Sequence, residues 1–223
     1  ACGVERPIGI VPLGIDTGVF RPREMNMQGK CVFGAAGRIE GASERKGVNE
    51  VIFAFQQAFP NEEDVALHLK TFADCRIAEL DDPRIKINRE YLSAAEMADW
   101  FSRLTCFVSA ARAEGWGMMQ HQALAVGRPI ISIRFAGVAE FFEPDAGYPL
   151  DFDLVPAADA FYGRGLWEKP DPRHMIHLMR TVYKNREEAR KRGRKGALCA
   201  SRFSAENAHE KLLNVMSEIG MID

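Results

Sequence analysis

Short apolar runs alternate along this chain with longer segments of helical periodicity. The run Thr105 to Ser109 is β-branched and aromatic and is bounded by small and polar residues, so it predicts an interior strand. Met118 to Val126 predicts an apolar helix that ends near Gly127. The apolar run opened by Pro129 predicts another strand over 129–133. This stretch is therefore predicted to form a strand, a helix and a strand.

The same alternation extends over the rest of the chain. Strands are predicted within 30–38 and over 65–72, 84–88 and 148–154; helices are predicted over 49–59 and 94–103. Ser93 and Glu96 form a capping-box pattern at the start of the second helix. The last third, 172–220, is predicted to be helical in three segments, with breaks near Asn185 and Arg202. Strands separated by helices predict an α/β fold with a Rossmann-like, doubly wound parallel sheet that binds ligands at the strands' carboxyl ends.

Two loops at such strand ends carry candidate chemistry. Glu114 lies just past the strand 105–109, and Gly115 and Gly117 remove side chains where the backbone turns into a helix. The amino-terminal N–H groups of that helix can therefore approach an anion or sugar hydroxyls closely. Gly37 and Arg38 end the strand within 30–38, and Lys46 precedes the next helix. Two cations beside a helix amino terminus suit a diphosphate, because arginine can fork onto two oxygens while lysine supplies a compact charge.

The segment 114–131, EGWGMMQHQALAVGRPII, resembles the nucleotide-sugar motif of GT-B retaining glycosyltransferases of family four, the glycosyl transferases group 1. The family pattern is E-G-F-G-x-x-x-x-E-A-x-A-x-G-x-P-V-I, and its matching positions here are Glu114, Gly115, Trp116, Gly117, Ala123, Ala125, Gly127, Pro129 and Ile131. Gln122 stands where the family has its second glutamate. An amide still bonds to a diol, but without the charge-assisted strength of a carboxylate.

The resemblance implies roles for these residues. In the family the first glutamate lies near the donor sugar and the second binds ribose hydroxyls, while the glycine-arginine turn and the lysine-glycine pair hold the diphosphate. Glu114, Arg38 and Lys46 are therefore the candidate catalytic residues. The candidate donor-binding residues are Gly37, Arg38, Lys46, Gly115, Trp116, Gly117, Met118 and Gln122. The implied ligand is a UDP- or GDP-sugar, and no metal is expected because the cations do the work of a divalent ion.

The resemblance also implies a domain organisation. Residues 11–22 resemble the family's interdomain crossing, and 165–171 with the following helices fit the family's tail. The whole chain, 1–223, is thus expected to be the donor-binding half of a GT-B enzyme, with 1–29 as the crossing segment and 171–223 as C-terminal helices. The acceptor domain would then lie outside this chain, on an N-terminal part of the parent polypeptide. Transfer to a saccharide, lipid or other acceptor, as in polysaccharide biosynthesis, is the implied activity.

Plainer interpretations stay open for each residue. Glu114 could merely cap a helix, Arg38 and Lys46 could be surface cations, and Gln122 could be a solvated amide. For the whole chain, a non-catalytic nucleotide-binding module is one alternative, and the substitution at Gln122 favours it. A GT-B-fold sugar-nucleotide epimerase is another, although the sequence offers no acid/base pair for it.

Composition excludes several other classes. Hydrophobic residues make up 47% and the formal net charge is -2, which indicates neither disorder nor a nucleic-acid-binding surface. No apolar run approaches the ~20 residues of a membrane span. The five cysteines show no metal-ligand spacing, so reduced, buried thiols and a cytoplasmic location are expected. A basic run, Lys184 to Lys195, leaves open contact with the inner membrane surface, although such runs are usually solvated.

Overall fold

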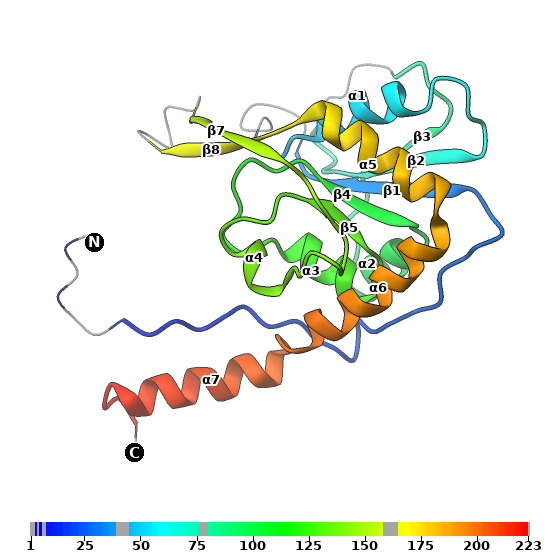
Figure 1. Ribbon diagram of the computed structural model, residues 1–223. Coiled ribbons are helices and arrows are strands. Elements are labelled where there is room, and N and C mark those ends of the chain that lie inside the picture. The colour runs from blue at the N-terminus through cyan, green and yellow to red at the C-terminus, as the bar shows by residue number, and fades with distance from the viewer. Residues whose placement is uncertain are drawn as a thin grey trace.

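The computed structural model describes residues 3, 5, 8–38, 45–75, 80–157 and 165–222. Its main sheet has six strands in the order β3-β2-β1-β4-β5-β6, and every neighbouring pair is parallel (Figure 1). These strands are β1 (Cys31–Ala36), β2 (Val65–Lys70), β3 (Ile85–Asn88), β4 (Cys106–Ser109), β5 (Ile130–Ser132) and β6 (Tyr148–Pro149). The predicted Rossmann-like parallel sheet is confirmed.

Helices cover both faces of this sheet (Figure 1). They are α1 (Val48–Ala58), α2 (Ala94–Ser102), α3 (Met118–Ala125), α4 (Val138–Phe141), α5 (Pro172–Lys184), α6 (Arg186–Ser201) and α7 (Ala205–Glu218). One apolar cluster joins the sheet to α1 and α5, and a second joins it to α2, α3 and α4. Neighbouring residues of one strand serve opposite clusters, as Val108 and Phe107 do, because side chains alternate across a strand.

The predicted strand 148–154 is wrong as a single element. Only Tyr148 and Pro149 pair with β5 at the edge of the main sheet, where proline's missing N–H is tolerated. The chain then leaves this sheet and forms β7 (Phe152–Pro156), which pairs in antiparallel register with β8 (Leu166–Pro170). The pattern predicted neither this hairpin nor the short helix α4.

The helix ends follow the predicted signals. Ser93 accepts a hydrogen bond from the N–H of Glu96, whose carboxylate accepts one from the N–H of Ser93, so the capping box is confirmed. The breaks near Asn185 and Arg202 are also confirmed. Asn185 ends α5 and caps α6 through a hydrogen bond from the N–H of Glu188 at 3.1 Å.

A buried arginine ties the first segment of the chain to the α3–β5 turn. The Arg128 guanidinium donates to the carbonyl oxygens of Arg23, Glu24 and Ser102 at 2.8, 2.9 and 2.7 Å. Burial lowers the pKa of Arg128 to about 10, which still leaves it charged at neutral pH. The chain around Arg23 is thereby fixed against the end of α3.

The described part of the amino-terminal segment runs beside α7 (Figure 1). Ile15 exchanges backbone hydrogen bonds with Phe203 and Ala205 at 3.0 and 2.8 Å. Nearer the N-terminus, a Cβ atom added to Gly9 would lie 2.1 Å from the Val215 side chain on α7, so the two segments are in close contact. This contact joins the predicted crossing segment to the predicted C-terminal helices.

Candidate functional site

The strand order creates a crevice between the carboxyl ends of β1 and β4. From β1 the chain moves outward to β2 and β3, and then crosses to β4 on the other side. The loops that follow β1 and β4 therefore diverge, which is the arrangement in which open α/β sheets bind ligands. Gly37 and Arg38 follow β1, and Glu114 follows β4, so the prediction that they share this edge is confirmed.

Lys46 and Glu114 meet directly at this crevice. The Lys46 Nζ lies 2.6 Å from the Glu114 Oε1, although the residues are 68 positions apart in the chain. Arg45 adds a second cation, with its guanidinium 2.7 Å from the carbonyl oxygen of Ala113 and 3.9 Å from the Glu114 Oε2. The Glu114 side chain retains 17% of its exposure, so the carboxylate is largely enclosed by these cations but open to a ligand.

The amino terminus of α1 opens onto the same place. Gly47 precedes the helix in the left-handed region, with φ of 61°, and no side chain caps the helix. Among the described residues, no side chain therefore engages the first N–H groups of α1, and the helix dipole favours an anion there. Gly47 is required sterically as well, because an added Cβ would lie 2.2 Å from the carbonyl oxygen of Ala110.

A second uncapped helix begins on the other side of Glu114. Gly117 has φ of 88° and precedes α3, again with no side-chain cap. Gly115 is exposed, and an added Cβ there would meet nothing within 4 Å. Two helix amino termini thus flank one ion pair, which gives the crevice several preorganised donors for an anionic ligand.

Arg38 lies toward the β2 side of the crevice. Its guanidinium is 2.7 Å from the Asp74 Oδ2 and stacks over the Phe72 ring at 5.1 Å. The hydrogen bond from Arg38 lowers the pKa of the Asp74 carboxyl. Both partners are about half exposed, and such pairs are weak, so Arg38 can turn to a phosphate at little cost.

A pocket of about 500 Å³ adjoins Lys46 at the ends of β1, β2 and β3. Its walls are mainly apolar and are formed by Ala36, Gly37, Lys46, Lys70, Thr71, Phe72, Ala73, Arg89, Glu90, Tyr91, Leu92, Met97 and Met119. The Thr71 hydroxyl is buried and has no hydrogen-bond partner within the part of the chain that the structure describes. A flat apolar group with polar edges, such as a nucleobase, fits walls of this kind.

Sequence reasoning missed most of this pocket. The sequence predicts strands over 65–72 and 84–88, so it also locates the carboxyl ends of these strands, where the pocket lies. What was missing was the strand order, which places the ends of β2 and β3 beside that of β1.

Comparisons with known proteins identify the family and the fold. Residues 30–162 match the model of the family described as glycosyl transferases group 1. The chain belongs to this family. An MMP alpha-(1->4)-mannosyltransferase of Mycolicibacterium hassiacum is 29% identical over 142 residues, which are 61% of this chain and 33% of the relative. The matched region is thus about a third of the length of that curated relative.

Solved glycosyltransferases share the fold. Sucrose-phosphate synthase from Thermosynechococcus elongatus superposes with a TM-score of 0.72 at 16% identity, over 94% of this chain and 52% of that one. The pneumococcal O-GlcNAc transferase, in complex with UDP and GlcNAc, gives a TM-score of 0.58 at 16% identity, over 97% of this chain and 40% of that one. At such identities the similarity establishes the GT-B-type α/β fold.

The structure places three other residues that the family motif predicts. The Trp116 indole packs against Phe141 and Phe203 with ring centroids 5.3 Å away. Met118 is partly buried against the second apolar cluster, as is its neighbour Met119, which lines the pocket. Gln122 is half-buried one helical turn beyond Met119, on the same face of α3. Its contact with ribose stays a prediction.

The buried His121 side chain links the Trp116 indole of the glycosyltransferase motif to the end of α6. Its Nδ1 accepts a hydrogen bond from the Trp116 indole at 3.1 Å, which places the proton on Nε2, 3.0 Å from the carbonyl oxygen of Ala200. The ring also stacks on Phe141 with centroids 4.7 Å apart. Burial lowers the pKa of His121 because it disfavours the charged ring, and this effect outweighs the hydrogen bond to Ala200, which raises the pKa.

This arrangement predicts a loss of stability in mild acid. The folded-state pKa of His121 lies below the ordinary histidine value of about 6.5, so the unfolded chain binds more protons between the two pKa values. The contribution of His121 is complete above 6.5 and disappears as the pH falls through the folded-state pKa. Urea unfolding across this range should show a weaker pH dependence in His121→Phe than in the wild type. His68 also has a lowered pKa and contributes to the same dependence, so the comparison is repeated in a His68→Gln background. An unchanged dependence after His121→Phe in that background contradicts the assignment.

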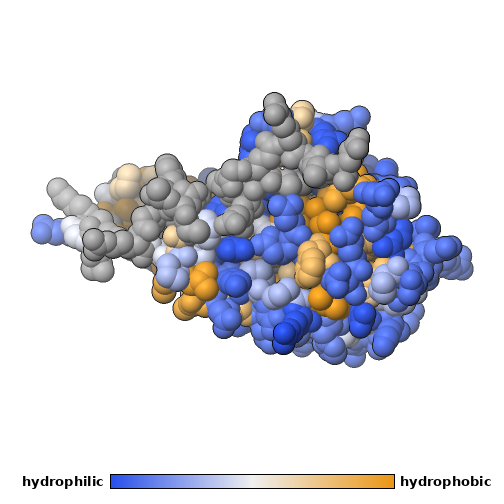
Figure 2. Space-filling view, turned by 90° about the horizontal axis from the view of Figure 1, so that it is seen from above, coloured by the Kyte–Doolittle hydropathy of each residue, from blue (hydrophilic) through white to orange (hydrophobic). Residues whose placement is uncertain are grey.

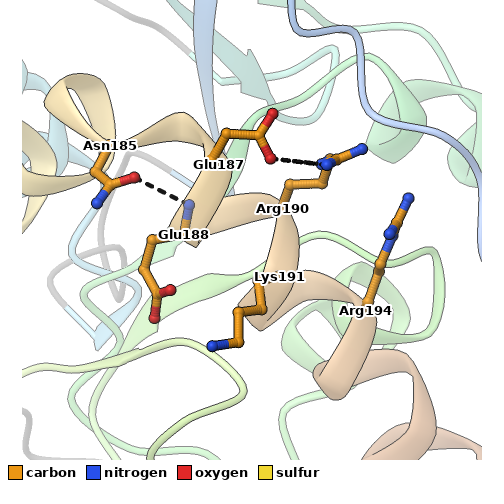
Figure 3. A pocket seen from close by; sticks show the side chains of 6 residues that line it. All are labelled: Asn185, Glu187, Glu188, Arg190, Lys191 and Arg194. Atoms are coloured by element: carbon orange, nitrogen blue, oxygen red, sulfur yellow. Dashed lines mark hydrogen bonds and ion pairs between the residues drawn. The ribbon is translucent and has the colours of Figure 1, made fainter.

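A separate hollow lies along α6 and is lined by charged side chains (Figure 3). It belongs to the amino edge of the sheet, because Arg186 donates to the carbonyl oxygens of Asn26 and Gly29 before β1. Basic residues here pair within the protein, as Arg190 does with Glu187 at 2.8 Å and Arg194 with Glu24 at 3.3 Å. Such pairing reduces the charge that these arginines could offer to anionic lipid, and the membrane contact stays a prediction.

The described residues form neither a membrane-spanning helix nor a metal-binding cluster. None of the helices in the described ranges combines the length and apolar character that a crossing needs. The face in Figure 2 is mainly hydrophilic, with separate hydrophobic patches. Within the residues that the structure describes, no group of three or more His, Cys, Asp or Glu side chains could hold a metal ion. Cys31, Cys106 and Cys199 are buried free thiols as expected, Cys75 is also buried, and Cys2 lies outside the described residues.

Proposed function

We propose that this chain is the nucleotide-sugar-binding domain of a retaining glycosyltransferase. The observation that carries the proposal is the Lys46–Glu114 pair at 2.6 Å, set between two uncapped helix amino termini and beside an apolar pocket. A nucleoside diphosphate sugar needs these three environments in this order. The pocket takes the base, the cations and helix ends take the diphosphate, and Glu114 meets the sugar.

The chemistry follows from charge placement. During transfer the bond between the sugar and the diphosphate oxygen breaks, and negative charge grows on that oxygen. Lys46 and the start of α1 already face this place and stabilise the charge there, and Arg38 joins them by turning from Asp74. The nucleotide is UDP or GDP in this proposal. The neighbouring O-GlcNAc transferase, in complex with UDP and GlcNAc, supports this ligand class.

The acceptor would come from another part of the parent polypeptide. The chain spans about half of the similar sucrose-phosphate synthase, which supports a second domain in the complete enzyme. In a two-domain transferase, orientation of the acceptor supplies much of the rate. The cytoplasm is the proposed location, with saccharides or lipids as the acceptor class.

One observation favours a second candidate function. Gln122 lacks the charge that the family uses on ribose, so a module that binds nucleotides without transfer is the alternative. Transfer by the complete polypeptide would exclude this alternative, and nucleotide binding without transfer would favour it.

Calorimetry on cation variants tests the proposed site. Arg38→Ala and Lys46→Ala should each weaken binding of UDP or GDP by ~1 to 3 kcal/mol, because each removes a charged hydrogen bond. The corresponding monophosphates should lose less. Arg194→Ala is the matched control, since Arg194 is also an exposed arginine with a carboxylate partner but lies on α6. Unchanged diphosphate affinity in both site variants would show that these cations do not hold the diphosphate.

A further inference from the structure

A small polar cavity lies beside Glu114, apart from the base pocket. It measures about 10 Å³, which is room for one water molecule or one hydroxyl group. Its polar lining comes from Glu114, Gln120, Ser132 and Glu168. The cavity therefore lies between the end of β5, the start of α3 and the β7–β8 hairpin.

Glu168 is held at this cavity by its own backbone. Its N–H donates to the carbonyl oxygen of Arg112 at 2.8 Å, which ties β8 to the loop that carries Glu114. Residue Glu168 is only 7% exposed. Among the described residues, its carboxyl has no hydrogen-bond or ion-pair partner besides its own backbone N–H. Burial raises the pKa of this carboxyl.

The other polar groups in the lining are already engaged. Glu114 binds Lys46, and the Gln120 amide donates to the Ser109 hydroxyl at 3.0 Å. Leaving a buried carboxyl without a partner destabilises a fold. A hydroxyl entering the cavity would supply the missing partner. Glu168 lies beyond the residues 30–162 that match the family model, so the hairpin brings a group that the matched region does not contain.

We propose that Glu168 contacts the donor sugar, through a hydrogen bond between its carboxyl and one hydroxyl of the sugar that enters the cavity beside Glu114. This inference rests on the proposed function, because it assumes that the sugar of the bound nucleotide lies at Glu114. It adds a specificity determinant: sugars that lack the hydroxyl facing the cavity bind less well. The ligand class is a nucleotide sugar with that hydroxyl free.

Paired calorimetry tests the inference on the full 223-residue chain. UDP is compared with UDP-glucose and GDP with GDP-mannose, in the wild type, Glu168→Ala and Glu168→Gln. The preference for the nucleotide sugar over the plain nucleotide should fall about tenfold in Glu168→Ala, which is the loss of one buried hydrogen bond. Glu168→Gln should lose less, since an amide still bonds to a hydroxyl. Asp153→Asn, an exposed carboxylate on the same hairpin, is the control and should change nothing.

Each outcome separates this inference from the proposed function. If the wild type binds neither nucleotide, the proposed function fails. If it binds nucleotides but the preference is the same in all variants, the role of Glu168 is overturned while the proposed function stands. If Glu168→Gln unfolds, or loses plain nucleotide and nucleotide sugar equally, the carboxyl supports the scaffold and the inference is wrong.

Discussion

Gly47→Ala is expected to lower the free energy of unfolding by about 2 to 4 kcal/mol, the largest stability effect at the candidate site. Alanine is unfavourable at φ of 61°, and its Cβ would lie 2.2 Å from the carbonyl oxygen of Ala110. Backbone atoms on both sides must then move, and these are the atoms that position Lys46 and the start of α1. Urea unfolding followed by circular dichroism measures the loss.

Gly115→Ala is the matched control for this prediction. Gly115 belongs to the neighbouring loop, but an added Cβ there meets nothing within 4 Å. Its unfolding midpoint should therefore stay within the small range of ordinary surface substitutions. Equal destabilisation by the two variants would mean that the contact between Gly47 and Ala110 is not what the loop requires.

Glu114→Ala is expected to cause the largest loss of activity. In a polypeptide that includes the acceptor domain, turnover should fall roughly 100-fold or more, because an interaction made at the reacting sugar is removed. Nucleotide affinity should change less. The 223-residue chain alone should bind nucleotides in the micromolar to millimolar range and transfer hardly any sugar, so the kinetics must be measured on the longer polypeptide.

The ion pair with Lys46 requires a second variant in this experiment. Glu114→Ala also frees Lys46, whose Nζ lies 2.6 Å from the carboxylate, and a free lysine could bind diphosphate differently. Glu114→Gln keeps a hydrogen-bond acceptor for Lys46 and removes the charge. A defect in nucleotide affinity alone, in both variants, would contradict the role of Glu114 at the sugar.

Local patterns in the sequence predicted the main sheet and most helices. The capping box at Ser93 and Glu96 and the break at Asn185 depend on neighbouring residues, and both are confirmed. The β7–β8 hairpin depends on pairing between segments that are distant in the chain, such as Phe152 with Pro170. No local pattern contains that pairing, so 148–154 was predicted as one strand.

The sequence predicts only part of the candidate site, because local patterns do not contain the contacts between distant segments. Glu114 was identified just past a strand and Lys46 at the start of a helix, and the structure places them in contact. Their direct pairing was not predicted, because it depends on how two loops pack. The pocket around Thr71 needed the strand order, and Glu168 lies on a hairpin that sequence reasoning did not find.

A crystal structure of this chain with UDP or GDP, whichever raises its melting temperature more, tests the central claim most directly. Bound nucleotide stabilises the folded state by mass action, so the melting temperature selects the better ligand. The diphosphate is predicted to lie at Lys46 and the start of α1, with the base in the pocket beside Thr71 and Tyr91. A nucleotide bound in the hollow on α6, with the carboxyl edge of the sheet empty, would contradict the account.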